Sequence, residues 1–174
     1  TLDGAGRVIC CGTFSKTLAP ALRLGFAVVP APLVPAFVRL RTLRDRGNDA
    51  LGQATLAEFM RQGLLAPHIR RVRTEYARRR AALLDALDRH VSLAHAMPAP
   101  GGLHMVARLE PGVDEARATA ACRARGLPVA PLAAYYADRP LVSGLVIGFA
   151  CTPEALAGDT ARRFEAALRA APAE

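Results

Sequence analysis

Two short apolar runs, separated by a polar loop, constrain the fold of this chain most strongly. The runs cover residues 7–11 and 22–29, and proline at positions 30 and 32 stops the second one. Continuous apolar runs of this length are typical of strands that are covered on both faces of a sheet. We therefore expect two buried strands joined by the loop between them.

That loop contains the one lysine of the chain, Lys16, among 23 lysine and arginine residues and a formal net charge of +8. An arginine side chain stays protonated, whereas a lysine amine can lose its proton and condense with a carbonyl group. A single lysine thus indicates a reactive amine. The alternative is an incidental exposed lysine in a composition that favours arginine.

Polar side chains surround Lys16 in a pattern that suits an anion. Hydroxyl groups are present at Thr13, Ser15 and Thr17, and a guanidinium follows at Arg23. Arginine offers paired donors to a phosphate, and hydroxyls can bind its remaining oxygens. The segment therefore predicts a nucleophilic amine beside a phosphate site.

Two common phosphate or nucleophile motifs do not match this segment. A nucleotide P-loop requires glycine where this chain has Cys10 and Ser15. The Ser-x-x-Lys pattern of serine β-lactamases requires serine at position 13, which is threonine here.

The segment GTFSKTLAPALRLGF, residues 12–26, resembles the Schiff-base segment of fold-type I, pyridoxal-phosphate-dependent aminotransferases of class I/II. It is most similar to the aminotransferase-like domain of MocR-type regulators of the GntR superfamily and to their 2-aminoadipate and kynurenine aminotransferase relatives. The segments GGLHMVARLE, residues 101–110, and GLVIGFA, residues 144–150, extend the resemblance over nearly the whole chain.

The resemblance implies a role for each polar residue of the loop. Lys16 would hold pyridoxal 5'-phosphate as a Schiff base, and its freed amine would act as a general base. Thr13 and Arg23 would bind the cofactor phosphate, with Ser15 as a weaker candidate. The resemblance also implies an amino acid or amine ligand and a homodimer.

The implied fold is α/β, with the C-terminal part of the large domain of an aspartate-aminotransferase-like transferase followed by its α+β small domain. We expect residues 1–66 to belong to the large domain, residues 67–92 to form a long connecting helix and residues 93–174 to form the small domain. The family's contacts to the cofactor ring lie upstream of the lysine, so we expect the chain to be a fragment.

One position departs from the family pattern. Active relatives bind the substrate carboxylate with an arginine in the last strand, where this chain has Val146 between Leu145 and Ile147. Arg139, in the preceding loop, is a weak candidate for a replacement. Loss of this contact favours a cofactor-binding sensor domain over an aminotransferase that turns over substrate.

The high positive charge leaves a nucleic-acid-binding module as a remote third hypothesis. Its basis is an arginine cluster at residues 70–80, but aromatic residues make up only 5% of the chain and no nucleic-acid-reading motif accompanies the cluster. We expect a solvated helix face there, and DNA binding only through a separate N-terminal domain. The four cysteines have no metal or redox spacing, which predicts buried thiols in a cytoplasmic protein. His104 has no partner at metal-ligand spacing, and nothing suggests a membrane segment.

The remaining pattern predicts alternating helices and strands. We expect Tyr76 in the apolar stripe of the long helix and residues 103–109 in a strand with one apolar face. The expected helices are residues 33–46, 49–62, 68–90 and 114–125, with a last helix starting at Thr152 and Pro153, and a further strand covers residues 144–151.

Overall fold

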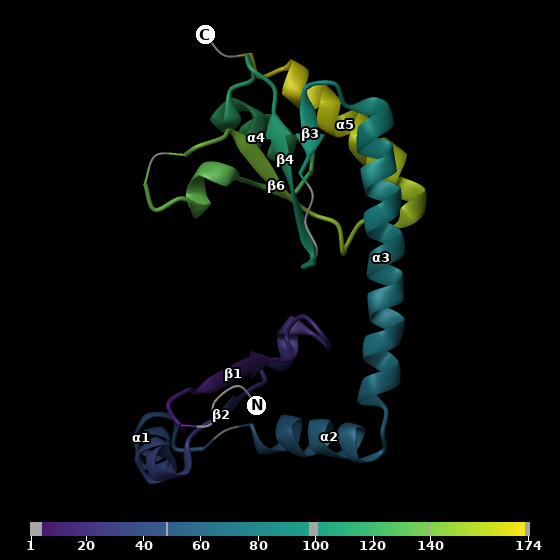
Figure 1. The fold of residues 1–174 in the computed structure, drawn as a ribbon. Helices are drawn as coiled ribbons and strands as arrows, with labels where there is room; N and C mark the ends of the chain where they lie inside the picture. Colours follow the sequence, from purple (N-terminus) through teal and green to yellow (C-terminus); the bar gives the residue numbers. More distant parts are fainter. Residues whose placement is uncertain (1–4, 48, 98–100, 139, 173–174) are drawn as a thin grey trace. The chain divides into compact units, whose positions relative to one another are not determined.

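The computed structural model describes residues 5–47, 49–97, 101–138 and 140–172. The chain divides into two compact units, Thr1–Val72 (unit 1) and Arg73–Glu174 (unit 2). A single long helix, α3 (Leu65–His90), contributes residues to both units (Figure 1).

Unit 1 contains a two-stranded antiparallel ribbon and two short helices in addition to the first turns of α3. Asp49 caps the second of these helices by accepting a hydrogen bond from the backbone N–H of Gly52, at 2.9 Å. This is the helix-start contact that an aspartate at this position favours. The elements are β1 (Cys10–Thr13), the 3-10 turn η1 (Pro20–Leu22), β2 (Gly25–Val28), the 3-10 turn η2 (Ala31–Leu33), α1 (Val34–Asp45) and α2 (Ala50–Arg61).

The expectation of two buried strands in unit 1 is wrong. The strands are shorter than predicted, and the side chains of Phe26 and Val28 are 49% and 62% exposed. A ribbon of two strands has two open faces, and no described residue of unit 1 is buried. The continuous apolar sequence therefore marks two strand faces that no described part of unit 1 covers.

The expectation of buried thiols is also wrong for three of the four cysteines. Cys10, Cys11 and Cys151 are exposed, and only Cys122 is buried. Burial raises the pKa of the Cys122 thiol to about 11. The two exposed cysteines of β1 follow from the open ribbon on which they lie.

Unit 2 is built on a four-stranded antiparallel sheet with the order β3-β4-β6-β5. Two helices, α4 and α5, pack with this sheet and with the second half of α3 (Figure 1). The elements are β3 (Ala94–Ala96), β4 (His104–Leu109), α4 (Glu115–Ala124), β5 (Val129–Pro131), η3 (Leu132–Tyr135), β6 (Gly144–Gly148), η4 (Glu154–Leu156) and α5 (Ala157–Arg169).

The core of unit 2 lies on one face of this sheet. Met105 pairs with Ile147 and Ala107 pairs with Leu145 in the β4–β6 register, and all four side chains are buried. Alternate residues of a strand point to opposite faces, so the neighbouring His104, Val106 and Arg108 fall on the other face. This confirms the predicted apolar face of residues 103–109. Tyr76 is partly buried against the same core, as expected.

Further element boundaries also differ from the prediction. Helix α3 begins at Leu65 rather than His68, which places Pro67 in its first turn, where a missing N–H leaves no hydrogen bond unmade. Strand β6 ends at Gly148 rather than Cys151, and a 3-10 turn separates Pro153 from α5. Within the described residues, no helix combines the length and apolarity that crossing a membrane requires.

Candidate functional site

The candidate site is the connection between β1 and β2, and the ribbon determines where its two ends lie. Thr13, the last residue of β1, pairs with Gly25, the first residue of β2. The N–H of Phe14 donates to the carbonyl of Leu24 at 3.0 Å, which extends the closure by one residue. The register therefore places Thr13 next to the chain that leaves Arg23.

Close packing across the ribbon holds these ends together. A Cβ atom on Gly12 would lie 2.4 Å from ring carbons of Phe26, so any larger residue there would displace this ring from the backbone that it crosses. The rings of Phe14 and Phe26 are tilted, with centroids 5.7 Å apart. A second glycine, Gly25, allows the same close approach on β2, because a Cβ there would lie 2.7 Å from the carbonyl oxygen of Gly12.

The hydroxyl groups of Thr13 and Ser15 lie together at the start of the loop. Thr13 Oγ1 accepts the backbone N–H of Ser15 at 3.1 Å and lies 2.9 Å from Ser15 Oγ. It also lies 3.3 Å from the carbonyl oxygen of Leu24. Two of the predicted phosphate ligands are thus adjacent and directed by the same turn.

Lys16 occupies a single turn of helix-like backbone. The N–H of Leu18 donates to the carbonyl of Phe14 at 2.8 Å, which closes the turn around the lysine. The Lys16 side chain is exposed, and it makes no hydrogen bond or ion pair with another described residue. Its amine is therefore accessible for chemistry.

Arg23 has an unusual backbone conformation at the other end of the loop. The short turn η1 ends at Arg23, whose N–H donates to the carbonyl of Pro20 at 3.3 Å. Its φ of 51° and ψ of 27° lie in the left-handed region, which costs a residue with a Cβ about 1–2 kcal/mol. The side chain is exposed and has no partner among the described residues.

A fifth residue, His68, contacts the loop and was not identified from the sequence. His68 Nε2 lies 2.8 Å from the carbonyl oxygen of Thr17, the residue directly after Lys16. Phe59 of α2 meets the His68 ring edge-on, with centroids 6.2 Å apart. The separation of 51 positions between Thr17 and His68 explains why no local spacing could reveal this contact.

The substrate-contact candidates lie in unit 2. Val146 pairs with Val106 on β4 and with Ala130 on β5, so it occupies the centre of the sheet, on the face opposite the buried core. It is apolar and partly buried there. Arg139 lies outside the described residues. Clusters of three or more metal-ligating side chains are absent from the part of the chain that the structure describes.

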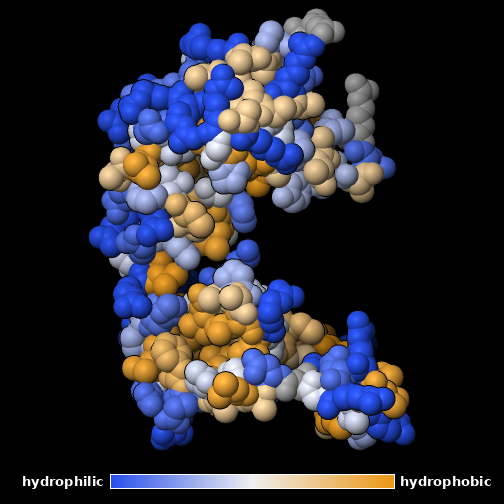
Figure 2. All heavy atoms as spheres, turned by 180° about the vertical axis from the view of Figure 1, so that it is seen from behind, coloured by the Kyte–Doolittle hydropathy of each residue, from blue (hydrophilic) through white to orange (hydrophobic). Residues whose placement is uncertain are grey.

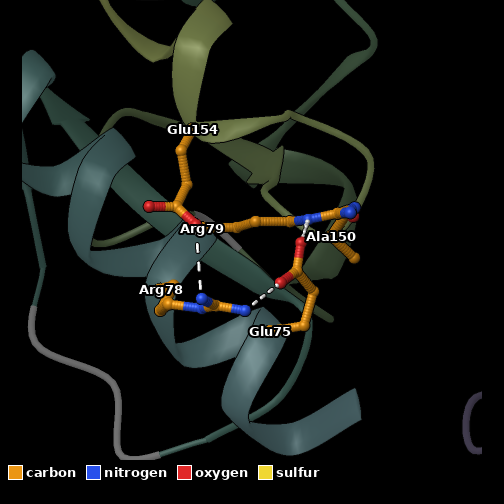
Figure 3. A network of polar contacts seen from close by, with 5 residues as sticks. All are labelled: Glu75, Arg78, Arg79, Ala150 and Glu154. Atoms are coloured by element: carbon orange, nitrogen blue, oxygen red, sulfur yellow. Dashed lines mark hydrogen bonds and ion pairs between the residues drawn. The ribbon is translucent and has the colours of Figure 1, made fainter. Parts of the chain in front are cut away.

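Four of the six arginines in the α3 cluster are exposed, as expected of a solvated helix face: Arg70, Arg71, Arg73 and Arg78. Arg78 binds Glu75 at 2.8 Å and lies 3.8 Å from Glu154, whereas Arg79 binds Glu75 and donates to the carbonyl oxygen of Ala150 (Figure 3). The Arg79 hydrogen bond is the main reason that the pKa of Glu75 is below its usual range. These contacts tie α3 to the segment after β6, which gives Arg79 a structural role.

The family model of aminotransferase class I and II matches residues 1–156. The chain belongs to this aminotransferase family. Its curated relatives include the probable rhizopine catabolism regulatory protein MocR of Rhizobium meliloti, which is 35% identical over 86% of this chain and 30% of its own length. The HTH-type pyridoxine biosynthesis transcriptional regulator PdxR of Corynebacterium glutamicum is 31% identical over 82% of this chain and 31% of its own length.

Solved aminotransferase structures share the fold. The kynurenine aminotransferase of Pyrococcus horikoshii, in complex with PMP, is 27% identical with a TM-score of 0.83, over 97% of this chain and 42% of that one. The α-aminoadipate aminotransferase LysN of Thermus thermophilus is 26% identical with a TM-score of 0.82, over 93% of this chain and 42% of that one. The chain spans about a third of the length of the two curated relatives, MocR and PdxR.

The predicted loop residues of this aminotransferase-family chain therefore lie in one connected stretch. Thr13 ends β1, and Ser15, Lys16 and Arg23 follow it in the connection to β2, all within unit 1. Their roles toward a cofactor stay predictions. The match of the family model supports the resemblance on which those predictions depend.

Proposed function

We propose that this chain supplies the lysine-bearing part of a pyridoxal-phosphate-binding domain that senses an effector in a MocR-type transcription regulator. The observation that carries the proposal is the lysine loop with Thr13 and Arg23 at its two ends, in a chain 35% identical to a protein named as a MocR regulator. DNA binding, a homodimer and an amino acid or amine effector are parts of this proposal.

The donor set of the loop fits pyridoxal phosphate. When bound, this cofactor supplies an aldehyde that condenses with primary amines and a ring that withdraws electrons. The exposed amine of Lys16 would hold the cofactor by condensing with that aldehyde, whose oxygen would leave as water. The guanidinium of Arg23 and the adjacent hydroxyls of Thr13 and Ser15 would hold the phosphate with charge-assisted hydrogen bonds.

The proposal of sensing rather than turnover is supported by β6. Val146 and its neighbours Leu145 and Ile147 offer no guanidinium for a substrate carboxylate. A bidentate, charge-assisted contact is worth about 2–3 kcal/mol, so an amino acid would bind less firmly without it. A ligand with a primary amine could still replace Lys16 on the cofactor without this arginine contact.

An active aminotransferase of the 2-aminoadipate or kynurenine type is the second candidate. Its support is the fold likeness to the kynurenine aminotransferase described above. In this case Lys16 Nζ would also act as a general base that moves a proton from the substrate carbon next to the amine to a carbon of the cofactor. We also propose that residues 1–66, 67–92 and 93–174 correspond to the end of a large domain, a connecting helix and a small domain.

Absorbance with and without Lys16 tests the cofactor assignment. The protein incubated with pyridoxal phosphate is expected to show a visible band of lysine-linked cofactor, and borohydride should fix the label on residue 16. Lys16→Ala should abolish both signals, and Lys16→Arg is the matched control that keeps the charge without the nucleophile. An unchanged band in Lys16→Arg would refute the assignment.

Turnover separates the two candidate functions. If the domain is a sensor, mixing the cofactor-loaded protein with an amino acid and a 2-oxo acid should convert no more than one equivalent of amino acid per protein chain. Catalytic amounts of product that depend on Lys16 would favour the aminotransferase.

A further inference from the structure

The turn that carries Lys16 leaves a backbone acceptor without a helical partner. The Phe14–Leu18 hydrogen bond closes one turn, but Pro20 has no N–H and the chain then enters η1. Carbonyl groups at the end of such a turn need a donor from elsewhere. The carbonyl of Thr17 is one of these groups.

His68 supplies that donor from the first turn of α3. Its Nε2 lies 2.8 Å from Thr17 O, and since a carbonyl can only accept, Nε2 must carry the proton. The other ring nitrogen, Nδ1, faces Arg71 NH2 at 3.4 Å, and a guanidinium can only donate. Both contacts are satisfied by one species, the neutral imidazole with its proton on Nε2.

Packing limits the other orientations of the ring. His68 is partly buried, and the Phe59 ring meets it edge-on. The loop also borders α2, because Leu18 and Leu22 line an apolar hollow of about 280 Å³ together with Leu56 and Phe59. The histidine thus lies at the corner where α2, α3 and the lysine loop meet within unit 1.

We propose that His68 is a positioning residue for Lys16. It holds the carbonyl of the next residue, Thr17, and so keeps the turn from changing the direction of the lysine amine. The link to reactivity rests on the proposed function of Lys16, whereas the effect on the loop backbone does not.

Amide hydrogen exchange tests the backbone part without any cofactor. His68→Leu should raise the exchange of residues 14–18 about fivefold, the factor expected for one ordinary hydrogen bond. His68→Gln, whose amide can place an N–H near the position of Nε2, should restore most of the protection. His90→Leu, at the exposed far end of α3, is the matched control and should change nothing in the loop.

Equal exchange in His68→Leu and wild type would overturn the proposal, and so would an equal loss of protection in the leucine and glutamine variants. The ring itself gives an independent measurement that needs no substitution. Long-range ¹H–¹⁵N correlation should show the proton of His68 on Nε2, and a proton on Nδ1 alone would contradict the donor role.

Reactivity of Lys16 separates this proposal from the proposed function. If wild type takes up pyridoxal phosphate, His68→Leu should slow borohydride-trapped labelling of residue 16 severalfold, and His68→Gln should label at close to the wild-type rate. Unchanged labelling in His68→Leu would refute the positioning of the amine and leave the cofactor assignment standing. If wild type takes up no cofactor, the proposed function fails, and the exchange and tautomer measurements still decide the role of His68.

Discussion

The two units of the chain differ in the burial of their apolar side chains. Every residue in the buried core, from Leu83 to Ala171, belongs to unit 2. In unit 1 no described residue is buried, and Leu43 and Leu51 are 80% and 78% exposed. Figure 2 shows the corresponding hydrophobic surface gathered over unit 1, in the lower half of that view.

The candidate site lies in unit 1, whereas the buried core that stabilises a fold lies in unit 2. The lysine loop belongs to the unit without a core, on a two-stranded ribbon of a kind that is only marginally stable in water. In the described residues, unit 2 has a four-stranded sheet, three α-helical segments and a continuous core. We therefore expect substitutions in unit 2 to change stability, and those in unit 1 to change mainly the site.

Matched leucine truncations give the largest expected effect. Leu83→Ala removes a fully buried side chain from α3 and should lower the free energy of unfolding by about 3 kcal/mol, within the range of buried leucines. Leu43→Ala, on the exposed surface of α1, should change it by less than about 0.5 kcal/mol. Urea unfolding followed by circular dichroism measures both. Comparable losses of unfolding free energy in the two variants would contradict this contrast and show that unit 1 has a core of its own.

Acid should act on the two units differently through Glu165 and Glu58. Glu165 of unit 2 is 8% exposed; burial raises its pKa, but hydrogen bonds from Ser92 and Leu93 and the charge of Arg169 outweigh this and lower it overall. A lowered pKa in the folded state means that its contribution is present above the unfolded value of about 4.3 and is lost as pH falls through the folded value.

Glu165→Gln should therefore cost about 1–2 kcal/mol of unfolding free energy at pH 7, because two backbone N–H groups lose an ionised acceptor. The gap to wild type should narrow as pH falls below about 4. Glu58→Gln is the control in unit 1, where Arg61 lowers the pKa of an exposed carboxylate, and we expect no measurable change. A gap that stays constant with pH would rule out the ionised carboxylate as the cause.

The parts of the fold that the sequence predicted depend on neighbours in the chain. The helices predicted at residues 49–62 and 114–125 form through local contacts, because Asp49 and Asp114 each accept the backbone N–H three residues further along the chain. Period-two alternation identified the buried face of β4. Thr13, Lys16 and Arg23 belong to one short segment at the end of β1 and in the loop after it, so the residue types of that segment and its family resemblance were enough to indicate the candidate site.

The parts that were missed depend on what lies far away in the chain. Cys10 and Val28 are exposed because no described element of unit 1 covers their strands. An apolar run predicts a strand, but it does not indicate whether another element packs on it. The contact of His68 with Thr17 joins residues 51 positions apart. Arg79 was expected to face solvent, but its contact with the carbonyl of Ala150 depends on a turn 71 residues away.

The smallest expected effect concerns left-handed backbone positions. Among the described residues, unit 2 uses only glycine at positive φ, whereas unit 1 also has Arg23 and Arg46 there, both with φ of 51°. Glycine adopts this conformation without strain, so Arg23→Gly and Arg46→Gly should each leave stability unchanged or raise it by about 0.5 kcal/mol. Thermal unfolding measures this effect for both variants.

Binding then distinguishes the two arginines, because Arg46 ends α1 and only Arg23 borders the lysine loop. Arg23→Gly should weaken pyridoxal phosphate binding about tenfold, the factor for one charge-assisted contact, while Arg46→Gly should bind like wild type. Equal affinity in both variants would remove Arg23 from the phosphate site. A loss of stability in Arg23→Gly would mean that the Arg23 side chain stabilises the ribbon. The same residue would then both stabilise unit 1 and bind the ligand.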